Sequence, residues 1–347
     1  MNKLLVFAWV VLLLNSCTDK DEWKKIDVSK IPVRLKVQRF EQDFHRFDTT
    51  HIAESEAGMR AKYGAFYDDY ISGIMGFGKP LSKLDIAGHD YHIDLLGFFA
   101  NKADQDLYDS VQQQYADISD IQNSLTAALQ HYHYYFPAAP TVTTVYTFLS
   151  EFANGTITYS DTILGIGLDM YLGENYRYYE SVGFPKFMQH KLQRVYIVPN
   201  SMEVLYNLNY DKTAYNAALP LIEAMVNEGK KYYFMECMLP EMPDSLLIGY
   251  TALQAEWCRN SEKQIWQYFN ERDLLYKVNF MEQKRYTTDG PTTAGMPPEA
   301  PPKVGSWLGW QIVRKFMKNS GGKVSLAELL THYSAKQIFT LANYKPK

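Results

Sequence analysis

The sequence predicts an α+β protein that is mostly helical. Between Val37 and Phe136, apolar residues recur at intervals of three and four, a spacing typical of helices. Residues 142–168 hold β-branched and aromatic runs separated by turn signals, which favours a small antiparallel sheet. Helical periodicity returns after Gly173. We therefore expect a helical N-terminal region followed by a region with a small antiparallel sheet and long helices.

The overall composition is that of an ordinary globular protein. The chain has 347 residues, of which 46% are hydrophobic and 21% are charged, close to average values for folded domains. Its 35 basic and 39 acidic residues give a net charge of −4. Binding to nucleic acid requires a concentrated positive field, so no nucleic-acid partner is expected.

The N-terminus has the pattern of a secretory signal. Lys3 precedes an uncharged run, residues 4–14, which as a helix would span about 16 Å, roughly half of a bilayer core. The run leads into Asn15, Ser16 and Cys17, which together resemble a lipobox. We expect a signal peptide over residues 1–16 and attachment to a membrane through lipid on Cys17. The alternative is a plain secretory signal with an incidental cysteine.

Residues 17–36 are polar and charged and are predicted to form a tether. The acidic residues Asp19, Asp21 and Glu22 resemble a surface-export signal of Gram-negative lipoproteins, although a solvated linker has the same composition. The remaining cysteines, Cys237 and Cys258, fall in helical segments, and the sequence leaves a disulfide between them open.

Residues 37–136 are predicted to form a helical region, ended by Pro137 and Pro140. His131 and His133 lie near its end. On a helix, residues two positions apart diverge by about 200°, so we expect these histidines at the surface or facing a partner.

Residues 137–347 begin with three predicted strands: 142–149, 156–159 and 162–168. Asn154-Gly155 and Ser160-Asp161 supply the turns of an antiparallel meander.

Gly165 and Gly167 indicate a bulge or a close backbone approach, as where an edge strand faces a ligand. Asp169 follows, and either accepts hydrogen bonds in a cleft or caps the next turn.

The C-terminal half is again helical. Pro220 is expected to begin a helix over Leu221–Met238, and helical periodicity continues to about Arg285. Residues 287–303 contain five prolines and two glycines and are predicted to form a long loop. An apolar helix with two tryptophans follows over Val304–Met317.

Five segments in this order resemble the gliding motility-associated lipoprotein B (GldB) family. They are RFEQDFHRFD (39–48), YGAFYDDYI (63–71), YTFLSEFANGTITYSDTILGIGLDMYLG (146–173), LIEAMVNEGKKYYF (221–234) and WLGWQIV (307–313). The resemblance covers nearly all of the chain after the signal peptide. It implies a lipidated protein of the cell envelope, expected in the outer membrane, tied in gliding bacteria to the motility machinery and without a settled biochemical activity.

The order of elements also resembles that of gluzincin metallopeptidases, a resemblance that concerns the fold. Such enzymes need two histidines one helical turn apart around a glutamate, and no histidine here is followed by glutamate. Met202 and Tyr206 flank Glu203 where the histidines would stand, and Glu228 lies where a third ligand is expected. We therefore expect no metal, no cofactor and no catalytic residue. The candidate cleft consists of Glu203, Tyr206, Glu228 and Asp169.

Three functions remain in competition. The first is a non-catalytic envelope lipoprotein that binds a protein partner in a motility or secretion apparatus. The second is a metal-dependent peptidase or related hydrolase with an unconventional site around Glu203, Glu228 and the pair His89 and His92. The third is a module that binds envelope glycan or peptide in a groove of tyrosines, namely Tyr171, Tyr176, Tyr178 and Tyr179.

Overall fold

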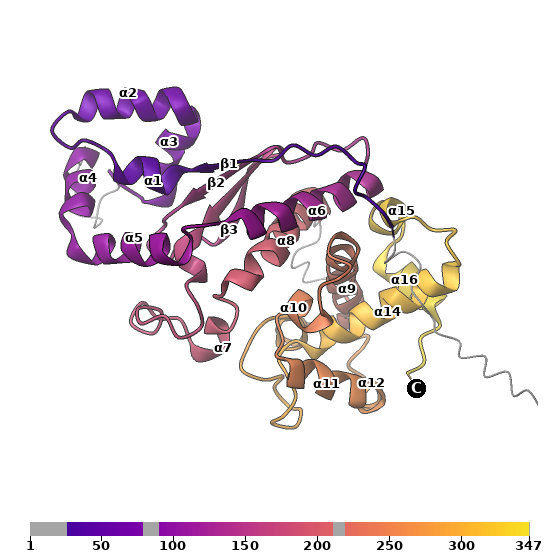
Figure 1. Ribbon diagram of the computed structural model, residues 1–347. Helices are drawn as coiled ribbons and strands as arrows, with labels where there is room; N and C mark the ends of the chain where they lie inside the picture. Colours follow the sequence, from indigo (N-terminus) through magenta and orange to yellow (C-terminus); the bar gives the residue numbers. More distant parts are fainter. Residues whose placement is uncertain (1–25, 79–89, 211–218, 347) are drawn as a thin grey trace, which may run out of the picture.

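The computed structural model describes residues 26–78, 90–210 and 219–346. The predicted signal peptide, the lipidation residue Cys17, the acidic residues after it, and His89 lie outside this part of the chain. Figure 1 shows helices α2–α5 at one end of the molecule, helices α9–α16 at the other, and the sheet between them. The mostly helical α+β class is confirmed.

The first elements build the sheet and the helices around it. In chain order they are β1 (Lys36–Arg39), α1 (Phe40–His45), α2 (Ile52–Tyr63), α3 (Ala65–Asp69), the π-helical turn η2 (Tyr70–Ile74), α4 (Tyr91–Ala100), α5 (Lys102–Gln114), α6 (Ser119–Tyr135), β2 (Thr144–Phe148), β3 (Thr156–Ser160), β4 (Ile163–Gly167) and the 3₁₀ turn η3 (Leu168–Tyr171).

The remaining elements are helical. In chain order they are α7 (Lys186–Gln189), the 3₁₀ turn η4 (Arg194–Tyr196), α8 (Ile197–Tyr210), α9 (Leu221–Met238), α10 (Asp244–Ile248), α11 (Ala252–Asn260), α12 (Glu262–Glu271), α13 (Phe280–Thr287), α14 (Val304–Ser320), α15 (Leu326–Thr331) and α16 (Ala335–Ala342). The predicted bounds of α9 and the predicted start of α14 are confirmed.

The sheet is mixed, so the predicted antiparallel meander is wrong. Its strand order is β1-β2-β4-β3, with β1 and β4 both parallel to β2. Only the β3–β4 hairpin, which turns at Ser160-Asp161 as predicted, is antiparallel. Strand β3 therefore lies at an edge and β4 lies inside the sheet, which corrects the expectation that the glycines of β4 mark an edge strand.

A close backbone approach explains Gly167. A Cβ atom at this position would lie 2.0 Å from the carbonyl oxygen of Asn154. The Gly167 amide donates to the Gly155 carbonyl at 2.6 Å. The Asn154-Gly155 turn thus packs against the end of β4 instead of joining β2 to β3 as paired neighbours. The predicted close approach is confirmed, whereas the register irregularity lies on β3 between Thr158 and Ser160.

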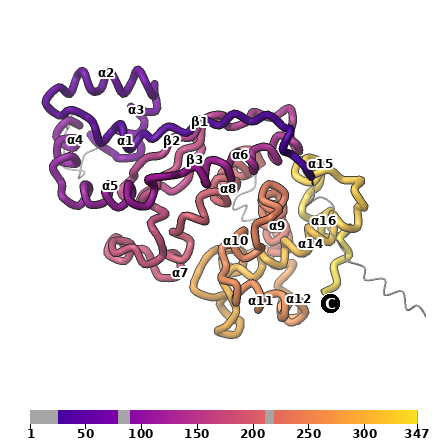
Figure 2. The backbone as a smooth tube through the Cα atoms, in the orientation of Figure 1, coloured from indigo at the N-terminus to yellow at the C-terminus, as the bar shows by residue number. Residues whose placement is uncertain are grey.

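Strand β1 lies within the region that the periodicity assigned to helix. Its four residues extend the sheet next to β2. The chain before it lies along α6, where Gln122 donates to the Leu35 carbonyl and Gln130 donates to the Ile31 carbonyl. Figure 2 shows this course of the chain beside α6. Val28 and Leu35 are buried, so the end of the predicted tether is part of the folded body.

Two clusters of buried side chains lie on opposite faces of the sheet. Tyr146 and Phe148 of β2 face the smaller cluster, which contains residues of α1–α4 and η2. Val145 and Leu164 face the larger cluster, which joins α5, α6 and α8 to the C-terminal helices. The alternation along β2 follows from the period of two in a strand. The larger cluster contains residues from both sides of residue 136, so the predicted regions 37–136 and 137–347 share one core.

Helices α9 and α14 cross at a pair of glycines. A Cβ at Gly309 would lie 1.7 Å from the Met225 carbonyl oxygen, and a Cβ at Gly229 would lie 2.3 Å from the Gly309 carbonyl. Backbone therefore touches backbone at the crossing. This close approach fixes the position of α9, which carries Glu228, against the C-terminal helices.

Candidate functional site

Glu203 and Glu228, two residues of the predicted cleft, come together between α8 and α9. The ammonium group of Lys231 lies between them, 2.9 Å from Glu203 Oε1 and 3.0 Å from Glu228 Oε2. Lys231 follows Glu228 by three positions, so both side chains leave the same face of α9. The lysine side chain is 13% exposed, whereas the two glutamates are about one-third exposed.

The electrostatics of this trio favour its charged form. Burial disfavours the ammonium of Lys231, but the adjacent Glu203 and Glu228 outweigh burial and raise its pKa well above the usual value. The charge of Lys231 in turn lowers the pKa of Glu203 against the opposing effect of burial. A cation supplied by the chain itself thus occupies the position between the two carboxylates.

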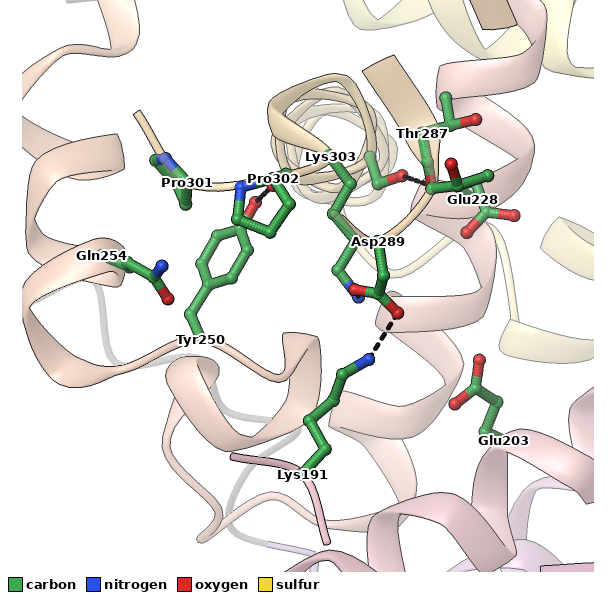
Figure 3. A network of polar contacts seen from close by, with 12 residues as sticks. Lys191, Glu203, Glu228, Tyr250, Gln254, Thr287, Asp289, Pro301, Pro302 and Lys303 are labelled. Carbon is green, nitrogen blue, oxygen red and sulfur yellow. Dashed lines mark hydrogen bonds and ion pairs between the residues drawn. The ribbon is translucent and has the colours of Figure 1, made fainter. Parts of the chain in front are cut away.

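A second charged trio lies next to the first. Asp289 accepts from Lys191 at 2.5 Å and from Lys303 at 2.9 Å (Figure 3). Lys303 is 6% exposed, and its ammonium lies 5.6 Å from the centre of the Tyr232 ring. We name these six residues the charged cluster: Lys191, Glu203, Glu228, Lys231, Asp289 and Lys303.

The charged cluster holds three positive and three negative groups, so its formal charges cancel. Burial opposes ionisation of Asp289, but Lys303 and Lys191 outweigh it and hold the pKa of this carboxyl well below its usual range. Lys191 differs from the other lysines, because burial and the neighbouring Lys303 lower its pKa despite the contact with Asp289. Internally paired charges of this kind organise a site and leave little free charge for a ligand.

The proline-rich loop is held in place at the charged cluster by hydrogen bonds to its carbonyl groups. Tyr250 donates to the Pro302 carbonyl at 2.6 Å, and Ser306 donates to the Thr287 carbonyl at 3.0 Å (Figure 3). Lys303 adopts φ +48°, a left-handed conformation just before α14. The loop thereby places Asp289 and Lys303 opposite Lys191.

Asp169 and Tyr206, the other two predicted cleft residues, lie apart from the charged cluster. Asp169 is fully buried and accepts hydrogen bonds from the amides of Ser150 (3.1 Å) and Phe152 (2.7 Å). It thus secures the turn after β2, a structural role at an earlier turn and not at the next one, which the sequence suggested. Tyr206 is 6% exposed and packs against Phe234 with 5.5 Å between ring centres.

The described histidine of the hypothetical metal pair is not near the charged cluster. His92 lies on α4 and contacts Glu56 and Asp90, each at 3.3 Å. Figure 1 shows α4 at the opposite end of the molecule from α9. Across residues 26–78, 90–210 and 219–346, no three histidine, cysteine, aspartate or glutamate side chains converge as metal ligands. Both Cys237 and Cys258 are buried free thiols.

The tyrosines of the third predicted function serve mainly as core residues. Tyr171 and Tyr179 are almost fully buried, and the Tyr179 hydroxyl donates to the Asp169 carbonyl at 2.8 Å. Tyr176 and Tyr178 are only partly buried. These four side chains therefore do not line one open groove.

The family model described as "Gliding motility protein GldB" matches residues 21–346. The chain belongs to the GldB family. Neither curated proteins nor solved structures provide a significant match. Within the described ranges, no helix of this GldB-family protein has both the length and the apolar character needed to cross a membrane.

The GldB-family fold also contains an apolar groove with a volume of about 810 Å³. It runs between α6, η4, the start of α8 and the chain that links α9 to α10. Its apolar side chains include Ile121, Val195, Val198, Met238, Met242 and Leu246. Val195 is 43% exposed. His131, which the sequence placed at the surface or facing a partner, is buried here, and its Nδ1 makes no hydrogen bond to a described residue.

Sequence reasoning missed four members of the charged cluster in this GldB-family chain. Lys231 had a detectable signal, because its spacing from Glu228 favours an ion pair on one helical face. Lys191, Asp289 and Lys303 had none. Asp289 and Lys303 lie at opposite ends of the proline-rich loop and Lys191 lies after α7, and only the tertiary fold brings the three together.

Proposed function

We propose that this protein is a lipid-anchored, non-catalytic component of a gliding-motility or secretion apparatus that binds an envelope protein partner. The coarser part of this statement follows from membership of the GldB family. The observation that carries the non-catalytic role is Lys231, whose ammonium contacts both Glu203 and Glu228. A general base must reach a substrate proton, and a metal ligand must reach an ion. Both carboxylates instead bind a cation that is part of the chain.

The groove beside α6 supplies the surface for the partner. Its lining is mainly apolar, and its rim charges Arg194 and Asp120 pair with each other. Burial lowers the pKa of His131, which favours the neutral imidazole. The groove therefore suits an apolar segment of an envelope protein that offers one polar group to the free His131 nitrogen.

Complementation of a strain lacking the gene separates binding from catalysis. We expect Val195→Asp to fail, because a charge in the groove opposes an apolar partner. Glu228→Gln should restore the wild-type phenotype, because the proposed function uses no chemistry at this carboxylate. Val182→Asp is the matched control, since Val182 is 50% exposed and does not line the groove. Immunoblots confirm equal protein levels.

The reverse pattern would contradict the proposal: loss of function in Glu228→Gln together with full function in Val195→Asp. Metal analysis of the full-length protein, purified in detergent without chelators, gives an independent test of the peptidase alternative. One equivalent of zinc that disappears in Glu228→Ala would establish a metal site and end the non-catalytic reading. The proposal includes a gluzincin-like fold, which the order of elements in the sequence suggests.

Anchoring through Cys17 has its own test. Cys17→Ser should prevent lipidation, so that the protein is uncleaved or no longer fractionates with membranes after leader removal. The measurement is fractionation combined with the mass of the mature chain. The control is Ser16→Ala, which retains the cysteine. Membrane attachment of a cleaved Cys17→Ser protein would show that another feature provides the anchor.

A further inference from the structure

A second cavity lies among the N-terminal helices, far from the charged cluster. Its volume is about 220 Å³, and residues of α1, η2, α4 and α5 enclose it. Aromatic rings form most of its wall, namely Phe44, Phe47, Tyr70, Phe98, Phe99 and Tyr108. Cavities of about 150 Å³ already accommodate a benzene ring. This cavity is therefore large enough for a four-carbon ligand.

The rings of the wall are held by contacts with one another. Phe44 and Phe99 have ring centres 5.2 Å apart, and Phe47 packs on Phe99 at 5.6 Å. His45 stacks on Tyr108 at 3.5 Å. Aromatic faces carry partial negative charge, so a wall of this kind attracts a cation that has lost part of its water.

Two carboxylates line the same cavity. Glu41 is 3% exposed and already has partners, because it accepts from Arg39 at 2.5 Å and from Thr147 at 2.6 Å. Asp104 differs, because no lysine or arginine of the described ranges lies within 4.0 Å of it. Burial raises the pKa of Asp104, against the opposing effect of a hydrogen bond with the Asn101 side chain. Of the two carboxyl groups at the cavity, Glu41 has a basic partner and Asp104 has none within this distance in the described part of the chain.

Tyr70 adds a hydroxyl-bearing side chain to the lining of the cavity. Its side chain is 1% exposed and lines the cavity. The carboxylates close enough to act electrostatically on this hydroxyl include Glu41 and Asp104. A tyrosine hydroxyl oxygen can accept a hydrogen bond from a ligand that donates one.

We propose that this cavity binds an alkylammonium group. The ammonium would donate to the Asp104 carboxylate and to the Tyr70 hydroxyl oxygen, while its methylene stem packs against Phe44 and Phe99. Such a ligand satisfies the carboxylate, the hydroxyl and the aromatic faces together. A neutral apolar molecule would gain nothing from the Asp104 carboxylate, and an anion would be repelled by it. The proposal is independent of the function assigned to the charged cluster and the groove.

The test is saturation-transfer NMR with the full-length protein in deuterated detergent. The probes are n-butylammonium, its uncharged analogue n-butanol, and N-acetyl-lysine methylamide. We expect n-butylammonium to bind about tenfold more tightly than n-butanol, a ratio that corresponds to about 1.4 kcal/mol. The lysine derivative distinguishes the source of the ammonium group. If it binds as tightly as n-butylammonium, the ligand is a lysine side chain of a peptide. If it binds about tenfold more weakly, the ligand is a free amine.

Two variants assign the binding to the cavity. Asp104→Asn should weaken n-butylammonium about tenfold, and Tyr70→Phe, which retains the ring, should weaken it about threefold. Asp106→Asn is the matched control, because it removes the same charge from α5, pairs with Lys102 and does not line the cavity. Circular dichroism confirms that each variant is folded. Equal binding of n-butanol and n-butylammonium, or unchanged affinity in both folded cavity variants, would overturn the proposal.

Discussion

Gly309→Ala is expected to destabilise the protein by more than about 3 kcal/mol. The added methyl group would lie 1.7 Å from the Met225 carbonyl oxygen. This neighbour is backbone within α9, so it cannot move aside as a flexible side chain does. Helices α9 and α14 would have to separate, and the buried Trp310 would lose packing with Tyr232 at the same crossing. The measurement is the free energy of unfolding in guanidinium chloride, followed by tryptophan fluorescence and circular dichroism.

Gly58→Ala is the matched control for this helix substitution. Gly58 lies on α2, its residue is exposed, and a Cβ there meets no atom within 4 Å. Alanine has the higher helix propensity, so this variant should gain about 1 kcal/mol. If the free energies of unfolding of Gly309→Ala and of the unmodified protein differ by less than about 1 kcal/mol, α9 and α14 do not cross as closely as described.

Glu236→Ala is expected to cost about 2–3 kcal/mol, because it removes one of the two carboxylates that bind Arg314 and leaves the buried Trp310 indole N–H without its acceptor. Glu236 is 3% exposed and accepts from Arg314 at 2.7 and 2.9 Å and from the Trp310 indole at 2.9 Å. Burial opposes the charge of Arg314, but Asp244 and Glu236 outweigh it and raise the pKa of the guanidinium. Removing Glu236 leaves Asp244 as the remaining carboxylate at Arg314. Equilibrium unfolding at pH 7 measures the loss.

Asp106→Ala provides the control for this buried ion pair. Asp106 contacts Lys102 at 2.7 Å, but the lysine side chain is 79% exposed. Solvent screens such a pair, so we expect a loss below about 1 kcal/mol. Similar losses for Glu236→Ala and Asp106→Ala would show that the network around Arg314 contributes no more than a surface contact.

The helices could be predicted from the sequence because their signals are local. Pro220 precedes α9, and α9 occupies the predicted Leu221–Met238. Strand pairing depends on contacts between distant segments, and here prediction failed. Strand β4 pairs with β2 as well as with β3, and β1 joins the sheet from a segment more than a hundred residues before β2. No turn signal specifies such parallel partners.

In the candidate site, too, the sequence predicted individual residues but not their contacts. The sequence singled out Glu203 and Glu228, and the fold brings both to one cation. It also singled out Asp169 and Tyr206, whose surroundings only the structure reveals. Asp169 secures a turn, and Tyr206 packs in the core. A residue's chemistry is visible in the sequence, but its neighbours depend on tertiary packing.

The sequence by itself determined the mostly helical class, the positions of long helices and, through the ordered segments, membership of the GldB family. Helical periodicity, proline positions and family motifs are all properties of the linear chain. Only the tertiary structure decided the mixed sheet, the charged cluster, the apolar groove and the aromatic cavity. Each of these joins segments distant along the chain, and their contacts arise from burial of apolar surface and pairing of charges that no local pattern specifies.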